Sequence, residues 1–95
     1  MVQDFDRQAV KVFKALGDAN RYGILRLLLE KGELSCADFD DKFKLSKPAM
    51  SHHYRILENA GLIEVRKEGL HFYMKANLAL LERFVPNFIK THIRR

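Results

Sequence analysis

Residues 45–62, LSKPAMSHHYRILENAGL, predict one helix whose two ends are both marked in the sequence. Ser46 can accept a hydrogen bond from a backbone N–H that the first turn leaves unpaired. Pro48 falls in that first turn, where its missing donor costs nothing. At the far end Gly61 suits the left-handed position that closes many helices. The stretch therefore predicts a helix over about residues 47–60.

The two faces of this predicted helix differ in chemistry. Its apolar face carries Met50, Tyr54 and Leu57, with His53 packed beside them. The opposite face carries four side chains that can donate hydrogen bonds: Lys47, Ser51, His52 and Arg55. An ordinary solvated face is the plain alternative, but a row of donors complements the acceptors of the DNA major groove. Adjacent helical residues point about 100° apart, so the two histidines are not expected to chelate one ion together.

A second capped helix precedes this one at a short distance along the chain. Ser35 can cap it, and Asp38 three residues later completes an acidic capping box. We expect this helix to end near Phe43, followed by a turn of about three residues around Lys44. Two short helices joined by so tight a turn predict a helix-turn-helix, whose second helix lies in the groove.

Apolar and polar residues alternate directly after the predicted recognition helix. Residues 63–66 and 70–75 have the two-residue period of strands, and Glu68-Gly69 lies between them as a turn. A helix-turn-helix followed by a basic hairpin is a winged helix. The predicted fold class is therefore mainly α, with the hairpin at 63–75 as its wing.

The rest of the chain is predicted to form helices at 4–16, 18–31 and 78–92. The second of these is apolar around most of its circumference, so we expect it in the centre of the core. Pro86 lies inside the last one, and the sequence leaves open whether it kinks or splits that helix. With 95 residues and no linker or repeat, the chain is predicted to be a single domain over 1–95.

Positive charge is concentrated in the second half of the chain. The formal net charge is +5, yet residues 1–41 hold six basic side chains against eight acidic ones. Residues 42–75, which include the predicted recognition helix and wing, hold seven against three. Such an imbalance often marks only a solvated face, but here it coincides with the donor-rich helix. It favours a polyanion as the partner.

The single cysteine, Cys36, excludes a disulfide within the chain and fits an intracellular setting. A small buried thiol is the plain interpretation of this residue. Its place on the first turn of a helix could instead lower its pKa and make it a redox sensor. The polar start and the lack of a long apolar run indicate no signal peptide and no membrane association, so we expect a cytoplasmic protein.

The chain resembles the ArsR/SmtB family of bacterial winged-helix repressors. Four pieces carry the resemblance: FKALGDANRYGILRLLL, the GEL before the acidic helix start, LSKPAMSHHYRILENAGLI and VRKEGLHFYM. The third is the most specific, because of its Ser-x-x-x-Ser-His-His pattern. The resemblance implies a homodimer that binds an inverted-repeat operator and blocks transcription. It also implies that the first and last helices form the dimer interface, and that many members release DNA on binding a metal ion.

The metal motif of the resembled family is absent at the expected place. Its best-known sensors carry Glu-Leu-Cys-Val-Cys-Asp, whereas residues 33–38 here are Glu-Leu-Ser-Cys-Ala-Asp. Both cysteine positions are lost, and Cys36 falls between them. The last helix offers only His92 where the family's other site needs paired ligands. We therefore predict no metal site and no cofactor, and release by oxidation at Cys36 or by a small molecule between the terminal helices.

The leading prediction is a dimeric, sequence-specific DNA-binding repressor. A winged helix with little sequence preference, or one used as a protein-interaction module, is the alternative. No triad, paired carboxylates or phosphate-cradling loop suggests an enzyme. The predicted DNA contacts are Lys44, Ser46, Lys47, Ser51, His52, Arg55, Arg66 and Lys67. The predicted dimer interface consists of Phe5, Val12, Leu81, Phe84, Val85 and Phe88.

Overall fold

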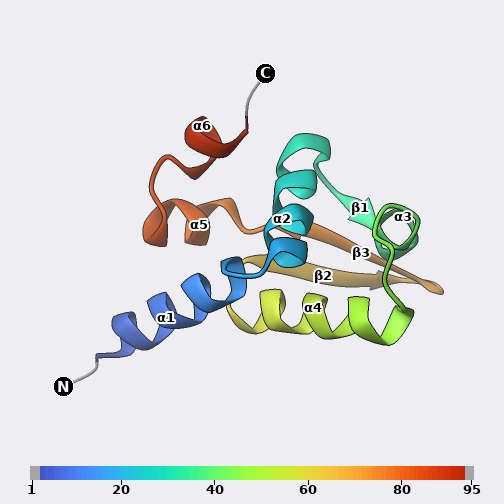
Figure 1. The fold of residues 1–95 in the computed structure, drawn as a ribbon, viewed down its shortest axis with the longest axis horizontal. Helices are drawn as coiled ribbons and strands as arrows, with labels where there is room; N and C mark the ends of the chain where they lie inside the picture. The colour runs from blue at the N-terminus through green and yellow to red at the C-terminus, as the bar shows by residue number, and fades with distance from the viewer. Residues whose placement is uncertain (1–2, 94–95) are drawn as a thin grey trace.

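A computed structural model describes residues 3–93 and has the order of elements of a winged helix (Figure 1). Its elements are α1 (Asp4–Leu16), α2 (Ala19–Lys31), β1 (Leu34–Ser35), α3 (Cys36–Asp40), α4 (Lys47–Asn59), β2 (Ile63–Glu68), β3 (His71–Ala76), α5 (Leu78–Phe84) and α6 (Phe88–His92). The predicted fold class, mainly α with a hairpin wing, is confirmed. No helix within residues 3–93 is long and apolar enough to cross a membrane.

The core lies where α2, α4 and the sheet meet. Ile24, Leu25 and Leu28 of α2 are buried, as the predicted central position of this helix requires. The largest fully buried side chains from the other elements include Val12, Phe39, Met50, Leu57, Leu62, Met74 and Leu81. The helix-turn-helix and the wing therefore share one hydrophobic core, which fixes the wing relative to α4.

The sheet has three strands in the order β1-β3-β2, all antiparallel. The wing is the β2–β3 hairpin, in which Glu68 pairs with His71 across the two-residue loop Gly69-Leu70. Gly69 has a φ of +63°, which suits glycine in such a tight turn. The strand β1 was not predicted, because two residues are too few to show alternation. It forms by pairing with a distant part of the chain, Leu34 opposite Met74.

Both predicted ends of α4 are confirmed. The Ser46 hydroxyl oxygen accepts a hydrogen bond from the N–H of Ala49 at 3.2 Å. At the other end Gly61 has a φ of +83°, and its N–H donates to the Glu58 carbonyl at 2.9 Å. The N–H of Leu62 donates to the Leu57 carbonyl at 3.0 Å, which completes a Schellman motif.

The third helix is shorter than predicted. Its capping box is confirmed, since Ser35 N–H donates to Asp38 at 3.1 Å and Asp38 N–H donates to the Ser35 hydroxyl at 3.2 Å. However, α3 ends at Asp40, and the expected end near Phe43 is wrong. Beyond Asp40 the chain follows hydrogen-bonded turns back to the Phe39 carbonyl rather than a regular helix.

Pro86 splits the predicted last helix into α5 and α6. Proline has no N–H to donate and pushes the residue before it out of the helical region. Val85 accordingly lies outside the helical region, with φ −134° and ψ 72°, and Asn87 takes a left-handed φ of +64°. Asn77 caps α5, because its side chain accepts a hydrogen bond from Leu80 N–H at 3.2 Å.

Candidate nucleic-acid interface

The outer face of α4 is open to solvent. All four of its predicted donors, Lys47, Ser51, His52 and Arg55, are exposed. Lys44 and Ser46, just before the helix, are exposed as well. Because α4 is capped at both ends and buried on its inner face, it presents these donors from a fixed helix.

Tyr54 joins the two helices of the helix-turn-helix. Its hydroxyl donates to Asp40 Oδ1 at 3.2 Å, and its ring packs edge-on against Phe39 with 6.0 Å between centroids. Burial raises the pKa of the Tyr54 hydroxyl far above its ordinary value, and the nearby Asp40 carboxylate adds to this rise. The phenol therefore stays a donor, and the angle between α3 and α4 is held by a hydrogen bond as well as by packing.

His53 anchors the inner side of α4 to the junction of α1 and α2. Its Nδ1 atom lies 3.2 Å from Nη1 of Arg21 and 3.8 Å from Oδ2 of Asp18. Arg21 in turn donates through Nε to the Ala15 carbonyl at 2.8 Å. The packed, hydrogen-bonded position predicted for His53 is confirmed, whereas His52 is exposed and its predicted groove contact stays a prediction. The Arg21 anchor was missed, because no local pattern links residues so far apart in the chain.

Asp18 has a second role at the same junction, as the N-cap of α2. It accepts hydrogen bonds from the N–H groups of Asn20 at 2.9 Å and Arg21 at 3.1 Å. The hydrogen bond from the Arg21 backbone is the main reason that the pKa of Asp18 lies below its ordinary value. The ionised carboxylate therefore helps to fix the start of α2 and the position of His53 together.

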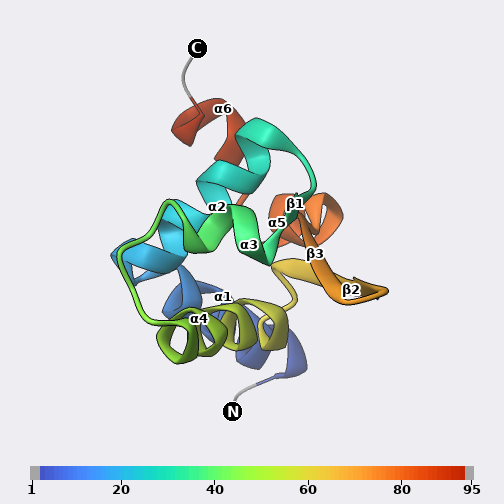
Figure 2. The same ribbon diagram turned by 90° about the vertical axis from the view of Figure 1, so that its right-hand side faces the viewer.

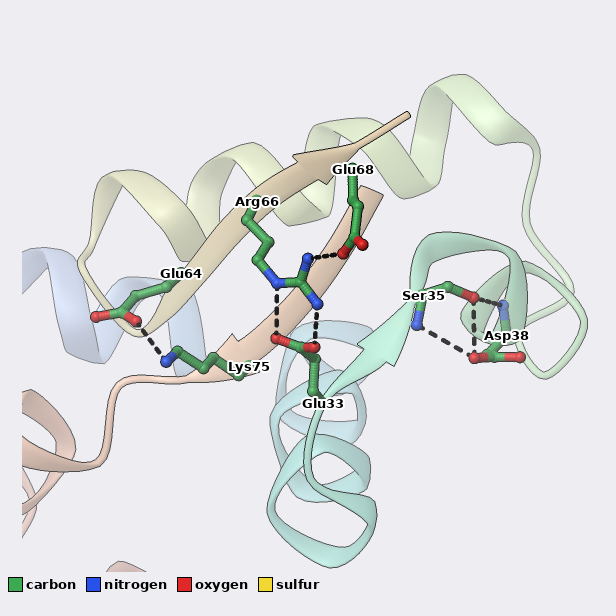
Figure 3. A network of polar contacts seen from close by, with 7 residues as sticks. All are labelled: Glu33, Ser35, Asp38, Glu64, Arg66, Glu68 and Lys75. Carbon is green, nitrogen blue, oxygen red and sulfur yellow. Dashed lines mark hydrogen bonds and ion pairs between the residues drawn. The ribbon is translucent and has the colours of Figure 1, made fainter. Parts of the chain in front are cut away.

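Arg66 on the wing is held by carboxylates of the same chain (Figure 3). Its guanidinium donates to Glu33 through Nη2 at 2.7 Å and Nε at 3.3 Å, and also to Glu68. The hydrogen bond from Arg66 lowers the pKa of Glu33, and these contacts raise the pKa of Arg66. The guanidinium also lies 4.7 Å from the Tyr73 ring centroid. This engagement argues against the predicted DNA contact by Arg66, since two carboxylates balance its charge.

Lys67 has a different orientation from Arg66. Successive side chains of a strand point to opposite faces, so Lys67 shares the face of Ile63 and Val65 that is turned toward α4. Its ammonium lies 5.8 Å from the centroid of the Phe72 ring, and the side chain is exposed. Figure 2 shows the wing projecting beside α4.

Large apolar side chains are exposed at the other end of the molecule, on and around α1, α5 and α6 (Figure 1). The exposed fractions are 48% for Phe5, 49% for Val10, 57% for Phe13, 55% for Leu78 and 44% for Ile89. Stacking of Phe5 on Phe84, with 4.8 Å between ring centroids, joins α1 to α5. We call this surface the apolar terminal face.

The predicted interface set includes three residues that lie beneath this face rather than on it. Val12 is 0% exposed, Leu81 2% and Phe88 3%, so their side chains belong to the protomer's own core. The helical spacing in the sequence identified the apolar positions of these helices, but it did not distinguish the buried residues from the exposed ones. Val10, Leu78 and Ile89, which are exposed, were missed for the same reason.

The pKa of Cys36 moves in the direction opposite to the one that the redox alternative requires. Burial raises it above its ordinary value, and the nearby Asp40 carboxylate raises it further. A helix of five residues is also too short to provide a strong dipole. The raised pKa disfavours a reactive thiolate and favours the plain interpretation of Cys36 as a partly buried thiol in the protein's packing.

His92 has structural contacts that account for its position. Its Nδ1 atom lies 2.8 Å from the Tyr22 hydroxyl, and its ring stacks on Phe88 with 4.2 Å between centroids. Within residues 3–93, no group of three or more His, Cys, Asp or Glu side chains is arranged to hold a metal ion.

Comparisons with known proteins agree with this architecture. Residues 16–66 match a family model described as a helix-turn-helix domain. The chain is 37% identical over 81 residues to the transcriptional repressor SdpR of Bacillus subtilis, covering 82% of this chain and 89% of that one. It is 36% identical over 76 residues to the arsenical resistance operon repressor of Staphylococcus aureus, covering 80% and 72%. An ArsR-like transcriptional regulator from Rhodococcus sp. RHA1 has a similar structure, with a TM-score of 0.74 and 26% identity over 88% of this chain and 78% of that one.

Proposed function

This chain belongs to the ArsR family of DNA-binding transcriptional repressors, and we propose that it acts as a homodimer on an inverted-repeat operator. In each protomer α4 lies in the major groove and the wing lies against the flanking backbone. The observation that carries this proposal is the exposed row of four donors on a helix that is capped at both ends and anchored on its inner face. The family is non-enzymatic, and the chain is accordingly a regulator.

Within the proposed complex, the donors on and just before α4 form two groups, according to the part of the DNA that each group can contact. Ser51, His52 and Arg55 lie along the middle of the exposed face, where they can meet base edges and provide sequence preference. Lys44, Ser46 and Lys47 lie at the start of α4, where phosphates approach a helix most readily. Lys67 supplies the phosphate contact of the wing. Arg66 is assigned to the support of the wing, because Glu33 and Glu68 hold it.

The apolar terminal face supports the proposed dimer. A monomeric protein rarely leaves several large apolar side chains exposed on one contiguous surface. Phe5 and Phe13 of α1, Leu78 of α5 and Ile89 of α6 are all about half exposed, which leaves them free to pack against a second copy. Twofold pairing through this face would place two copies of α4 on successive half-sites, as an inverted repeat requires.

The signal that releases the repressor is proposed to be a small molecule rather than a metal ion or an oxidant. A zinc site needs three or four ligands in near-tetrahedral geometry, and each protomer has one cysteine. The raised pKa of Cys36 disfavours the thiolate that a redox sensor uses. Because the proposed target is chromosomal DNA, the compartment proposed for the protein is the cytoplasm.

Selection of a binding site from random duplexes, followed by titration at several salt concentrations, tests this function. We expect an inverted repeat to emerge, bound by a dimer and at least a thousandfold more tightly than scrambled DNA. Lys67→Ala should make the slope of log affinity against log salt concentration shallower by the amount expected for the loss of about one phosphate contact. The change should be the same on both duplexes. Lys31→Ala, at an exposed lysine at the end of α2, is the control and should leave the slope unchanged.

Each alternative function predicts a different result in the same experiment. A winged helix with little sequence preference would yield no enriched repeat and equal affinity for scrambled DNA. A protein-interaction module would bind no duplex at all at moderate salt.

A further inference from the structure

A cleft of about 330 Å³ lies between α4 and the sheet. Its lining residues come from α3, α4 and both strands of the wing: Cys36, Asp40, Lys47, Ser51, Tyr54, Arg55, Glu58, Val65, Phe72 and Met74. Figure 2 shows how the wing and α4, which contribute most of this lining, are placed relative to each other. The volume is within the range of sites that hold small organic molecules.

The sheet side of the cleft is apolar. Val65, Phe72 and Met74 all belong to the face of the sheet that is turned toward α4, as the two-residue alternation of the strands requires. Met74 is fully buried and forms the floor, whereas the Phe72 side chain is 47% exposed. A half-exposed aromatic ring beside a cavity is a surface on which a flat apolar group can pack.

The inner end of the cleft carries negative charge. Asp40 is half-buried and accepts the hydrogen bond of Tyr54 at 3.2 Å. It forms no ion pair with any residue between 3 and 93, so its charge is not neutralised by a basic side chain there. Glu58, a second carboxylate on the α4 side, is exposed, so its charge is screened by water and salt. A phosphate group would be repelled from this end, whereas a cation would be attracted.

Two basic residues at the rim of the cleft would instead attract an anion. Lys47 and Arg55 are exposed, so water and salt screen their charges, whereas the half-buried Asp40 is screened less. The Phe72 ring already has a cation near it, the Lys67 ammonium at 5.8 Å from its centroid. Aromatic rings attract cations through the negative potential above their faces. The cleft thus combines an aromatic wall with an anionic end.

We propose that this cleft is a binding site for a small aromatic ammonium compound. The ring of the ligand packs against Phe72 and Val65, and its ammonium group lies at the Asp40 carboxylate. Lys47, Ser51 and Arg55 belong to the lining of the cleft and also to the proposed DNA face. The bound ligand and the operator therefore exclude each other, and the compound acts as an inducer. This second part rests on the proposed function.

Binding of three probes that share one ring but differ in charge tests the site without DNA. Phenethylamine is a cation at neutral pH, phenethyl alcohol is neutral and phenylpropionate is an anion. Followed by amide NMR, phenethylamine should shift Cys36, Val65 and Phe72 and bind about tenfold more tightly than the alcohol. Phenylpropionate should bind most weakly. Equal affinities for all three probes, or shifts confined to another region, would overturn the proposed site.

Two neighbouring carboxylates give a matched pair of variants. Asp40→Asn keeps an acceptor for the Tyr54 hydroxyl but removes the charge, so it should bring the amine and the alcohol close to equal affinity. Asp41→Asn removes an exposed charge that does not line the cleft, and it should keep the tenfold preference. An Asp40→Asn protein that still prefers the amine as the wild type does would refute the role of Asp40.

Competition on the selected operator tests the regulatory part. Saturating phenethylamine should lower the operator affinity of the wild type at least tenfold and that of Asp40→Asn far less. Operator binding that is unchanged by an amine shown to be bound would refute mutual exclusion. If the amine binds with the predicted charge preference but no duplex is bound, the proposed DNA function fails while the ligand site stands.

Discussion

Gly61, which closes α4, is the position where one added methyl group probes the geometry most sharply. Its φ is +83°, and a Cβ there would lie 2.6 Å from Cδ1 of Leu80 and 3.4 Å from Nε2 of Gln8. A side chain in the left-handed region costs about 1–2 kcal/mol. The Leu80 side chain must also shift to make room, and an off-rotamer conformation would add a further cost of about 0.5–1.5 kcal/mol. We therefore expect Gly61→Ala to lower the free energy of unfolding by roughly 1.5–3.5 kcal/mol.

Gly69→Ala on the wing separates the two contributions. Gly69 also has a positive φ, +63°, but a Cβ there would meet no atom within 4 Å. It should lose only the conformational part, roughly 1–2 kcal/mol. Urea unfolding followed by circular dichroism, at one protein concentration because the stability of an oligomer depends on it, gives both values. Equal losses in the two variants would refute the close approach of Leu80, and no loss in either would refute the left-handed conformation.

Three further predictions concern the interface, the cap of α2 and the inducing signal. Phe13→Asp should convert a dimer into monomers in sedimentation velocity, whereas Leu70→Asp, at a 92% exposed apolar residue on the wing, should leave the dimer intact; dimers in both would contradict the proposed interface. Asp18→Ala should lower the free energy of unfolding by about 1 kcal/mol at neutral pH. Folding lowers the pKa of Asp18 below its unfolded value near 3.8. The stabilisation by this carboxylate is therefore complete above the unfolded pKa and is lost as the pH falls through the folded pKa, so the wild type and Asp18→Ala should become equally stable in acid. A difference in the free energy of unfolding that stays constant down to low pH would contradict this. Zinc, cadmium or arsenite at low micromolar concentration should not release the operator, and release coupled to stoichiometric metal binding would show a site that the sequence did not reveal.

Local signals in the sequence were sufficient for the helix-turn-helix. Ser46, Gly61 and the capping box at Ser35 act within a few residues of chain, and each was found where the pattern indicated. The split at Pro86 was left open, because the choice between a kink and a break depends on what the second half packs against. Here α6 packs through Phe88 and His92 against Tyr22 of α2.

Features built from distant parts of the chain were not predictable in the same way. The strand β1 exists only as a partner of β3, and the anchor of α4 joins Arg21 to His53. Arg66 was predicted to contact DNA because it is a basic residue on a hairpin. Its pairing with Glu33 depends on β1 lying beside the wing, which no spacing in the sequence indicates.

The measurement that tests the central claim most directly is the affinity of Ser51→Ala and His52→Ala for the selected operator and for a scrambled duplex of equal length. If these side chains contact base edges, each substitution should cost about 1–3 kcal/mol on the operator and little on the scrambled duplex. Asn59→Ala, at an exposed residue of α4 outside the proposed contacts, is the control and should behave as the wild type on both. Equal losses on operator and scrambled DNA for Ser51→Ala and His52→Ala would contradict the account, because the exposed face of α4 would then provide affinity without sequence preference.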